Sequence, residues 1–246
     1  MKMFVSQCKM ELLRLVRNKR FYFMSLGFPI LFYMIFSSTV GENAEVGGTV
    51  WKAYYLISMT AFGLINASIN SLAVKMSQER AQGLVRLLQI TPLSPRAYIG
   101  AKILALSIVN LGVIVAMFLT GYFVKGVSLA PMQWIGCGIW LWAGSLIFLA
   151  LGSLIGSSRK AEIAQILGTV LQLGLSLTGG LWMPVQSMPE VMREIAFWTP
   201  TFHFASGAWE LLAGHAPGWG NAMILAAYLI VFVIGSSYVH QKQEAV

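Results

Sequence analysis

Long apolar segments alternate with short polar segments along this chain. Six of the apolar segments have close to the ~20 residues that a helix needs to cross a bilayer. They are residues 21–40, 53–74, 98–124, 134–156, 163–182 and 219–239. A segment that crosses lipid must satisfy its own backbone hydrogen bonds, which a helix does. The pattern therefore predicts an all-α integral membrane protein with six transmembrane helices.

The charge-free run 126–158 is too long for one straight span. We expect Pro131 to lie in a loop and the fourth transmembrane helix to begin at Trp134.

Residues 1–20 are basic and amphipathic. Apolar side chains from Met1 to Val16 fall within one arc of about 120° on a helical wheel, and the lysines and arginines lie outside it. This pattern predicts an interfacial helix on the cytoplasmic membrane surface. The alternative is a juxtamembrane tail that only sets the topology.

Residues 75–97 form a polar, basic segment between the second and third spans. Leu84, Leu87 and Leu88 recur at helical spacing, which indicates a short amphipathic helix. Pro92 is expected to end this helix, and Ser94 to cap the next one. The apolar face of the short helix requires a partner, unless the segment only connects two spans.

Residues 183–217 are too polar to cross a membrane and too apolar for an ordinary loop. The spacing of Ser187 and Glu190 predicts a capping box at the start of a short helix, and Thr199 with Pro200 separates it from a second one. We expect a re-entrant helical hairpin in the outer leaflet, between spans five and six.

Basic residues are distributed unevenly between the two sides of the predicted membrane. With the N-terminus in the cytoplasm, fourteen of the seventeen lysines and arginines lie on the cytoplasmic side, which leaves Lys52, Lys125 and Arg193 outside. The bias places both termini in the cytoplasm of a multi-pass protein, in a bacterial-type plasma (inner) membrane. The formal net charge of +8 is explained by an anionic membrane surface, and we expect no nucleic-acid partner.

Composition and motifs argue against an enzyme. The chain is 57% hydrophobic and only 11% charged, so lipid must cover most of its surface. It lacks Walker A, GxSxG, HExxH and CxxC motifs. His203, Glu210 and His215 are conceivable zinc ligands, but polar loop residues are the preferred interpretation. We therefore expect no catalytic residues, no cofactor and no metal in this chain.

The predicted spans carry amides, hydroxyls and small residues, and no ionisable group is expected near the membrane midplane, where an ion-coupled carrier would need one. Helix packing is the preferred role of these residues, and a weakly polar path or a dimer interface is the alternative. The candidates for such a path or interface are Gly63, Asn66, Asn70, Asn110, Gln165, Gln172 and Ser176.

The order of these segments resembles the type-2 ABC exporter permease family, in its drug and antimicrobial export branch. The resemblance covers nearly the whole chain. It is carried chiefly by two stretches, Glu79 to Ser94 with Gly100 to Lys102, and Gly179 to Pro184 followed by Met188, Pro189 and Pro200.

The resemblance implies a coupling helix that docks on a separate ATPase subunit, which would bind the ATP and magnesium. The implied coupling residues are Glu79, Arg80, Gly83, Leu84, Arg86, Leu87, Leu88, Thr91 and Pro92. It also implies a dimer of permeases, homodimeric or heterodimeric, that moves a drug, an antimicrobial peptide or a lipid-like molecule outward. The alternatives are an ion-coupled carrier without an ATPase, and a membrane-embedded transferase or scaffold that uses His203, Glu210 or His215.

Overall fold

The structure, a computed structural model, describes residues 2–39, 44–84, 94–158 and 160–244. Its elements, in chain order, are α1 (Lys2–Val16), α2 (Lys19–Tyr22), the π-helical turn η1 (Phe23–Gly27), α3 (Phe28–Thr39), β1 (Glu45–Val46), β2 (Thr49–Val50), α4 (Trp51–Asn66), the π-helical turn η2 (Ala67–Ser71), α5 (Leu72–Ala81), α7 (Pro95–Lys125), α8 (Pro131–Ile155), α9 (Ala161–Thr178), the 3₁₀ turn η3 (Val185–Ser187), α10 (Glu190–Ala196), α11 (Pro200–Leu212) and α12 (Trp219–Glu244).

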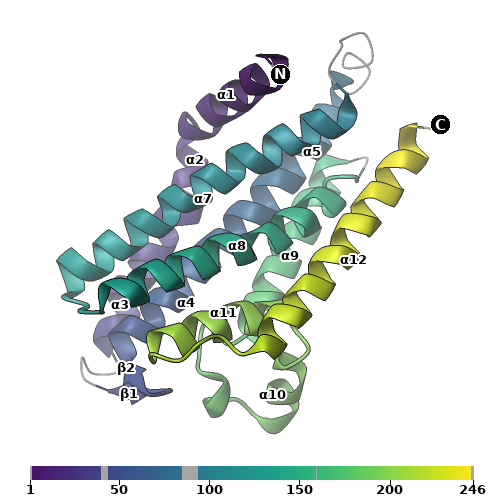
Figure 1. Cartoon of the computed structure of the whole chain (residues 1–246). Coiled ribbons are helices and arrows are strands. Elements are labelled where there is room, and N and C mark those ends of the chain that lie inside the picture. The colour runs from purple at the N-terminus through teal and green to yellow at the C-terminus, as the bar shows by residue number, and fades with distance from the viewer. Residues whose placement is uncertain (1, 40–43, 85–93, 159, 245–246) are drawn as a thin grey trace.

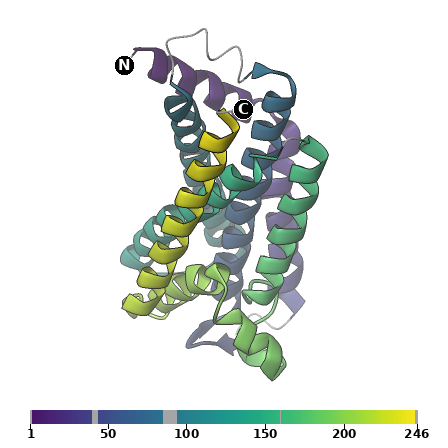
Figure 2. The same cartoon turned by 90° about the vertical axis from the view of Figure 1, so that its right-hand side faces the viewer.

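The long helices form one bundle with distinct ends (Figure 1). Helix α1 and the C-terminal end of α12 lie at one end, where α5 also ends, and α10 with the β1–β2 hairpin lies at the other (Figure 2). Both ends of the chain therefore lie at the same end of the bundle.

Five described helices are long and apolar enough to cross a membrane. The first of them, Trp51–Ala81, runs without interruption through α4, η2 and α5, and most of its side chains are buried in the bundle. Helix α12 is the opposite case, since few of its side chains are fully buried and many of its apolar side chains are exposed, as lipid-facing side chains are. The first expected span, 21–40, consists of α2, η1 and α3, and its apolar helix Phe23–Ser38 is shorter than the other five.

The chain is not wholly α-helical, because β1 and β2 form a small antiparallel hairpin. Gly47 and Gly48 connect the strands with φ values of 60° and 78°. Two successive positive φ values favour a tight turn that pairs the flanking residues, and only glycine adopts them without strain. The described chain is otherwise helical, which agrees with the expected all-α membrane class, and the hairpin is an addition to it.

Helix α8 begins at Pro131, so the expectation of a loop before Trp134 was wrong. Proline is well tolerated in the first turn of a helix, where its missing N–H has no intrahelical partner to lose. The Gln133 side chain accepts a hydrogen bond from the Ala130 N–H at 2.8 Å and so caps the helix. The expected cap of α7 is confirmed, because Ser94 Oγ accepts a hydrogen bond from the Ala97 N–H.

The segment between α9 and α12 contains two short helices, α10 and α11. The expected capping box is absent, because Pro189 adopts an extended conformation directly before α10 and Ser187 ends the preceding 3₁₀ turn. Helix α11 begins at Pro200 behind Thr199, whose hydroxyl accepts the Phe202 N–H. It packs against α4, α8 and α12, and most of its side chains are buried.

A row of side chains on one face of α8 attaches it to α11. They donate to α11 carbonyl groups one turn apart: Gln133 Nε2 to Leu212 at 2.8 Å, Cys137 Sγ to Ala208 at 3.4 Å and Trp140 Nε1 to Phe204 at 2.8 Å. Gly207 permits this close packing, since a Cβ there would lie 2.2 Å from the Trp140 ring.

Candidate functional site

A cavity of about 620 Å³ lies between the N-terminal helices, the central helix Trp51–Ala81 and α9. Its volume is within the range of small-molecule sites. The lining residues come from α1 through α3, from α4 through α5, and from α9. They are Arg14, Leu15, Asn18, Phe21, Met24, Ser25, Phe28, Phe62, Asn66, Asn70, Ser71, Val74, Lys75, Gln78, Gln165, Thr169, Gln172 and Leu173.

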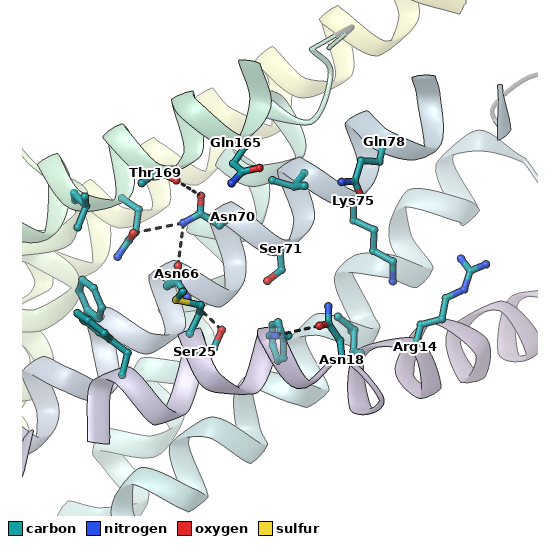
Figure 3. A pocket seen from close by; sticks show the side chains of 18 residues that line it. Arg14, Asn18, Ser25, Asn66, Asn70, Ser71, Lys75, Gln78, Gln165 and Thr169 are labelled. Atoms are coloured by element: carbon teal, nitrogen blue, oxygen red, sulfur yellow. Dashed lines mark hydrogen bonds between the residues drawn. The ribbon is translucent and has the colours of Figure 1, made fainter. Parts of the chain in front are cut away.

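Amide side chains form a hydrogen-bonded chain along one part of this cavity (Figure 3). Asn70 Nδ2 donates to Asn66 Oδ1 at 2.9 Å and to Gln172 Oε1 at 3.4 Å. Asn66 Nδ2 donates in turn to Ser25 Oγ, and Thr169 Oγ1 donates to Asn70 Oδ1, each at 3.4 Å. Asn70 thus connects the central helix to α9, while Asn66 connects it to η1.

Both π-helical turns of the described chain border the cavity. Met24 and Ser25 belong to η1, and Asn70 and Ser71 belong to η2. A π turn inserts one residue into a helix and changes the direction of the side chains that follow it, and such turns occur frequently at functional sites. Their coincidence at one cavity marks it as the candidate functional site.

Close backbone contacts hold the helices around the amide residues. A Cβ on Gly168 of α9 would lie 2.6 Å from Asn70 Oδ1, and a Cβ on Gly63 would lie 2.6 Å from the Ser25 carbonyl oxygen. On the far side of η2, a Cβ on Gly152 of α8 would lie 2.5 Å from the Ser68 carbonyl oxygen. Glycine is therefore needed at Gly63 and Gly152, where the contacted atoms belong to the backbone, while at Gly168 the contacted atom is the end of the Asn70 side chain.

A cluster of five charged residues lies next to the cavity, at the bundle end that carries both chain ends. Glu11 pairs with Lys102 at 2.8 Å and with Lys75 at 2.5 Å. Glu79 pairs with Lys102 at 2.6 Å and with Arg14 at 3.4 Å, and it also accepts a hydrogen bond from the Tyr98 hydroxyl. These contacts join α1, α5 and α7.

The cluster is buried, although it consists of charges. Glu11 and Lys102 are 1% and 2% exposed, and Glu79 is 6% exposed. Such burial is tolerated only where every charge has partners, because an unpaired buried charge costs several kcal/mol. Burial alone would raise the pKa of the Glu11 carboxyl, but the neighbouring Lys102 and Lys75 outweigh burial and hold this pKa below its ordinary value of 4.5.

Acidification is expected to weaken the attachment of α1. Because the pKa of Glu11 is lower in the folded state, its contribution to stability is complete above the ordinary value of 4.5 and is lost as the pH falls through the folded value. Glu11→Gln should lack this step in a plot of Tm against pH, and should be about 2 kcal/mol less stable at neutral pH. The exposed Glu162 on α9 provides the control, since Glu162→Gln should retain the step. Identical acid profiles for Glu11→Gln and wild type would contradict this role of Glu11.

The cavity brings together four of the seven residues predicted to form a path or interface: Asn66, Asn70, Gln165 and Gln172. The other three lie elsewhere. Gly63 packs α4 against η1, as described above, and Ser176 is buried on α9 outside the cavity lining.

Asn110 has a packing role. It is fully buried in α7, and its Nδ2 donates to Ser68 Oγ and Ser145 Oγ, each at 3.1 Å. It therefore connects α7 to η2 and α8.

Four of the predicted coupling residues are described, and Arg86, Leu87, Leu88, Thr91 and Pro92 lie outside the described residues. Glu79 belongs to the buried charge cluster. Arg80 Nη1 donates to the Ser157 carbonyl at 2.8 Å, which attaches α5 to the segment between α8 and α9. Gly83, with φ 73°, follows the end of α5, and Leu84 is half-buried.

Sequence reasoning did not identify Glu11 and Lys102 as partners. Lys102 lies within the expected third span, 98–124, so the spans are not free of fixed charge. It pairs with Glu11 and Glu79, and its Nζ lies 4.7 Å from the centre of the Tyr98 ring. Two sequence features could have pointed to this pairing. They are the single acid in the otherwise basic helix 2–16, and the lysine one turn after Tyr98. Ser25 and Thr169 were missed because isolated hydroxyls in an apolar helix carry no distinctive pattern.

The residues considered for zinc or transferase chemistry form internal contacts. His203 Nδ1 lies 2.7 Å from Asn221 Oδ1, and His203 Nε2 lies 2.8 Å from the Phe197 carbonyl oxygen. Glu210 accepts from Asn221 Nδ2 at 3.0 Å and from the Gly218 N–H at 2.6 Å. Among residues 2–39, 44–84, 94–158 and 160–244, no group of three or more His, Cys, Asp or Glu side chains could hold a metal ion. The contacts of His203 and Glu210 with Asn221 connect α11 to the start of α12.

Comparison with known proteins identifies the family of this chain. The family model described as ABC-2 family transporter protein matches residues 47–238. Over 236 residues the chain is 42% identical to the Putative transport permease YvfS of Bacillus subtilis (strain 168), and the match covers 96% of each protein. It is also 27% identical over 191 residues to the Inner membrane transport permease YhhJ of Escherichia coli (strain K12), covering 72% of this chain and 49% of that protein. Together with a bundle of apolar helices around a polar cavity, these matches show that the chain belongs to the ABC-2 transporter family and is a transport permease of this type.

Proposed function

We propose that this chain is the permease of an ABC exporter, and that it moves an amphipathic molecule such as a drug, an antimicrobial peptide or a lipid-like compound outward across a bacterial plasma membrane. A separate ATPase subunit supplies the energy, a second permease completes the pathway, and both chain termini lie in the cytoplasm. The observation that carries the proposal is the polar cavity at the π-helical turns, which lies beside the charge cluster at the end of α5.

The central helix connects the cavity to the proposed coupling segment. Trp51–Ala81 is one continuous helix that carries Asn66 and Asn70 in the cavity and ends directly before Gly83. A displacement of residues 75–97 by an ATPase is therefore transmitted along a stiff rod to the amide residues. The π turn η2 interrupts the regular hydrogen bonding of this rod at the cavity, where a change of helical register is least costly.

The end of α5 is attached on two sides, so the displacement reaches more than one helix. Glu79 and Lys75 pair with α1 and α7, while Ser77 Oγ and Arg80 Nη1 donate at 2.8 Å to the carbonyl groups of Ser158 and Ser157. Because Glu79 is buried in these contacts, we assign it the role of holding the coupling segment in place. We assign docking on the ATPase to Arg86, Leu87 and Leu88, which lie outside the described residues.

Leu87→Asp is expected to detach the ATPase while the permease stays folded. Loss of one apolar side chain from a docking groove removes ~1.5–3 kcal/mol, so we expect roughly tenfold or greater loss of ATPase retention in a pull-down. Nucleotide-driven export from vesicles should fall with it, and the Tm of the purified permease should not change.

Lys52→Asp is the matched control, because Lys52 lies at the opposite end of the bundle, is only half-buried and donates to the Gly126 carbonyl. Full ATPase retention and export by Leu87→Asp would contradict the assignment of the coupling segment. Transport by the purified permease in liposomes without an ATPase would favour an ion-coupled carrier.

A further inference from the structure

We propose that the cavity binds an amphipathic anion, with a phosphate or carboxylate head group at Arg14 and Lys75 and its uncharged part along the amides and the aromatic wall. The proposal of a binding site is based on the geometry of the cavity. The identification of this anion as the cargo rests on the export function proposed above.

The charges around the cavity select an anion. Arg14 and Lys75 line it, and none of its eighteen lining residues is acidic. Both cations lie at one end of the cavity and the amides Asn66 and Asn70 at the other (Figure 3).

The nearby acids offset only part of this positive charge, although Glu11 pairs with Lys75 at 2.5 Å and Glu79 with Arg14 at 3.4 Å. Glu11 and Glu79 are buried behind the cavity wall, and Lys102, itself only 2% exposed, pairs with both of them. The cluster therefore carries three cations against two acids. The Arg14 side chain is 56% exposed and its contact with Glu79 is 3.4 Å long, so its guanidinium retains donors for a ligand.

An unsatisfied donor in the cavity also points to a ligand that accepts hydrogen bonds. Gln172 is 4% exposed, and its Nε2 has no hydrogen-bond partner among the described residues, although its Oε1 accepts from Asn70. A buried amide donor without a partner is costly, and in native structures such a group calls for an explanation. A carbonyl, ester or hydroxyl oxygen behind the head group of a bound amphiphile would satisfy it.

The remaining wall suits the apolar part of the ligand. The rings of Phe28 and Phe62 lie 5.8 Å apart. The apolar residues of the lining are Leu15, Phe21, Met24, Phe28, Phe62, Val74 and Leu173. The cavity thus combines a cationic end, an uncharged polar end and apolar sides. A cationic amphiphile would meet two positive charges there and no acid.

The test compares two single-chain amphiphiles that differ mainly in head-group charge. Dodecyl phosphate and dodecyltrimethylammonium are titrated separately against the purified full-length chain in phosphatidylcholine nanodiscs, without ATPase or nucleotide, and binding is measured by equilibrium dialysis against empty nanodiscs. We expect saturable binding of dodecyl phosphate only. Arg14→Gln should weaken it about tenfold and Gln172→Leu about threefold, as the loss of a charged and of a neutral hydrogen bond respectively.

Lys52→Gln removes the same charge far from the cavity and should bind as the wild type does. The Tm of each variant is measured alongside. If Arg14→Gln folds poorly, Gln172→Leu still tests the site, because it leaves the charge cluster intact. The proposal is overturned if dodecyltrimethylammonium binds as tightly as dodecyl phosphate, or if the folded variants retain wild-type affinity.

A second arm identifies the source of the anion. Phosphatidylglycerol is added to the nanodiscs: competition with dodecyl phosphate assigns the site to a membrane lipid, and unchanged affinity assigns it to a free amphiphile, both in support of an anion site. Because no ATPase is present, a failure to bind dodecyl phosphate leaves the coupling proposal intact. Conversely, normal binding with full ATPase retention by Leu87→Asp would contradict only the coupling assignment.

Discussion

Replacement of Lys102 by methionine is expected to lower the free energy of unfolding by about 3–5 kcal/mol, the cost of leaving buried charges without their partner. Lys102 is the most deeply buried cation of the cluster, and it contacts Glu11 at 2.8 Å and Glu79 at 2.6 Å, whereas the exposed Arg14 contacts them at 3.9 Å and 3.4 Å. Without it, Glu79 keeps only Arg14 as a cationic partner among the described residues, at 3.4 Å, while Glu11 keeps Lys75 and the more distant Arg14. We expect α1 to detach from α7 and the Tm to fall sharply.

Neutralising the acids should restore much of this loss. Lys102→Met combined with Glu11→Gln and Glu79→Gln removes the uncompensated charges, and well-packed neutral replacements of buried ion pairs are often tolerated. Lys52→Met, at a half-buried lysine that donates to a backbone carbonyl, is the control and should change the Tm little. If Lys102→Met were as stable as this control, the buried cluster would have no part in stability.

Replacement of Gly152 by alanine is expected to destabilise the protein by about 1–3 kcal/mol through overpacking. The new Cβ would lie 2.5 Å from the Ser68 carbonyl oxygen, and backbone atoms cannot move aside as a flexible side chain can. Helix α8 must then separate from η2, which also displaces Asn70 and Ser71 in the cavity. The variant should therefore show both a lower Tm and weaker binding of dodecyl phosphate.

Gly112 provides a matched control in α7, because a Cβ there would meet no atom within 4 Å. Gly112→Ala should be neutral, or slightly stabilising through the higher helix propensity of alanine, worth up to about 1 kcal/mol. Equal stability of Gly152→Ala and Gly112→Ala would show that α8 and η2 are not closely packed.

The sequence predicts helices well in this chain and predicts contacts between them poorly. Apolar runs of about 20 residues indicate membrane helices because lipid imposes length and hydropathy on each segment separately. The β1–β2 hairpin was missed because it is only four residues of strand around Gly47 and Gly48, within a polar connection. The start of α8 was placed too late because Pro131 is compatible with both a loop and the first turn of a helix.

The candidate site illustrates the same limit. Asn66 and Asn70 lie one turn apart on one helix, so their shared face is visible in the sequence. Their partner Gln172 lies 102 residues beyond Asn70, and only the packing of Gly168 against Asn70 brings α9 close enough. The pairing of Glu11 with Lys102 is equally remote, since nothing local to either residue identifies the other.

The span of chain between those two residues sets an order of assembly. Glu11 precedes Lys102 by 91 positions, and a chain is synthesised from its N-terminus. Helix α1 emerges from the ribosome before Lys75 on α5 and well before Lys102 on α7, so the set of partners around Glu11 is complete only when the third hydrophobic helix has been made. The N-terminal helix is thus the first segment to be synthesised and among the last to be fixed in place.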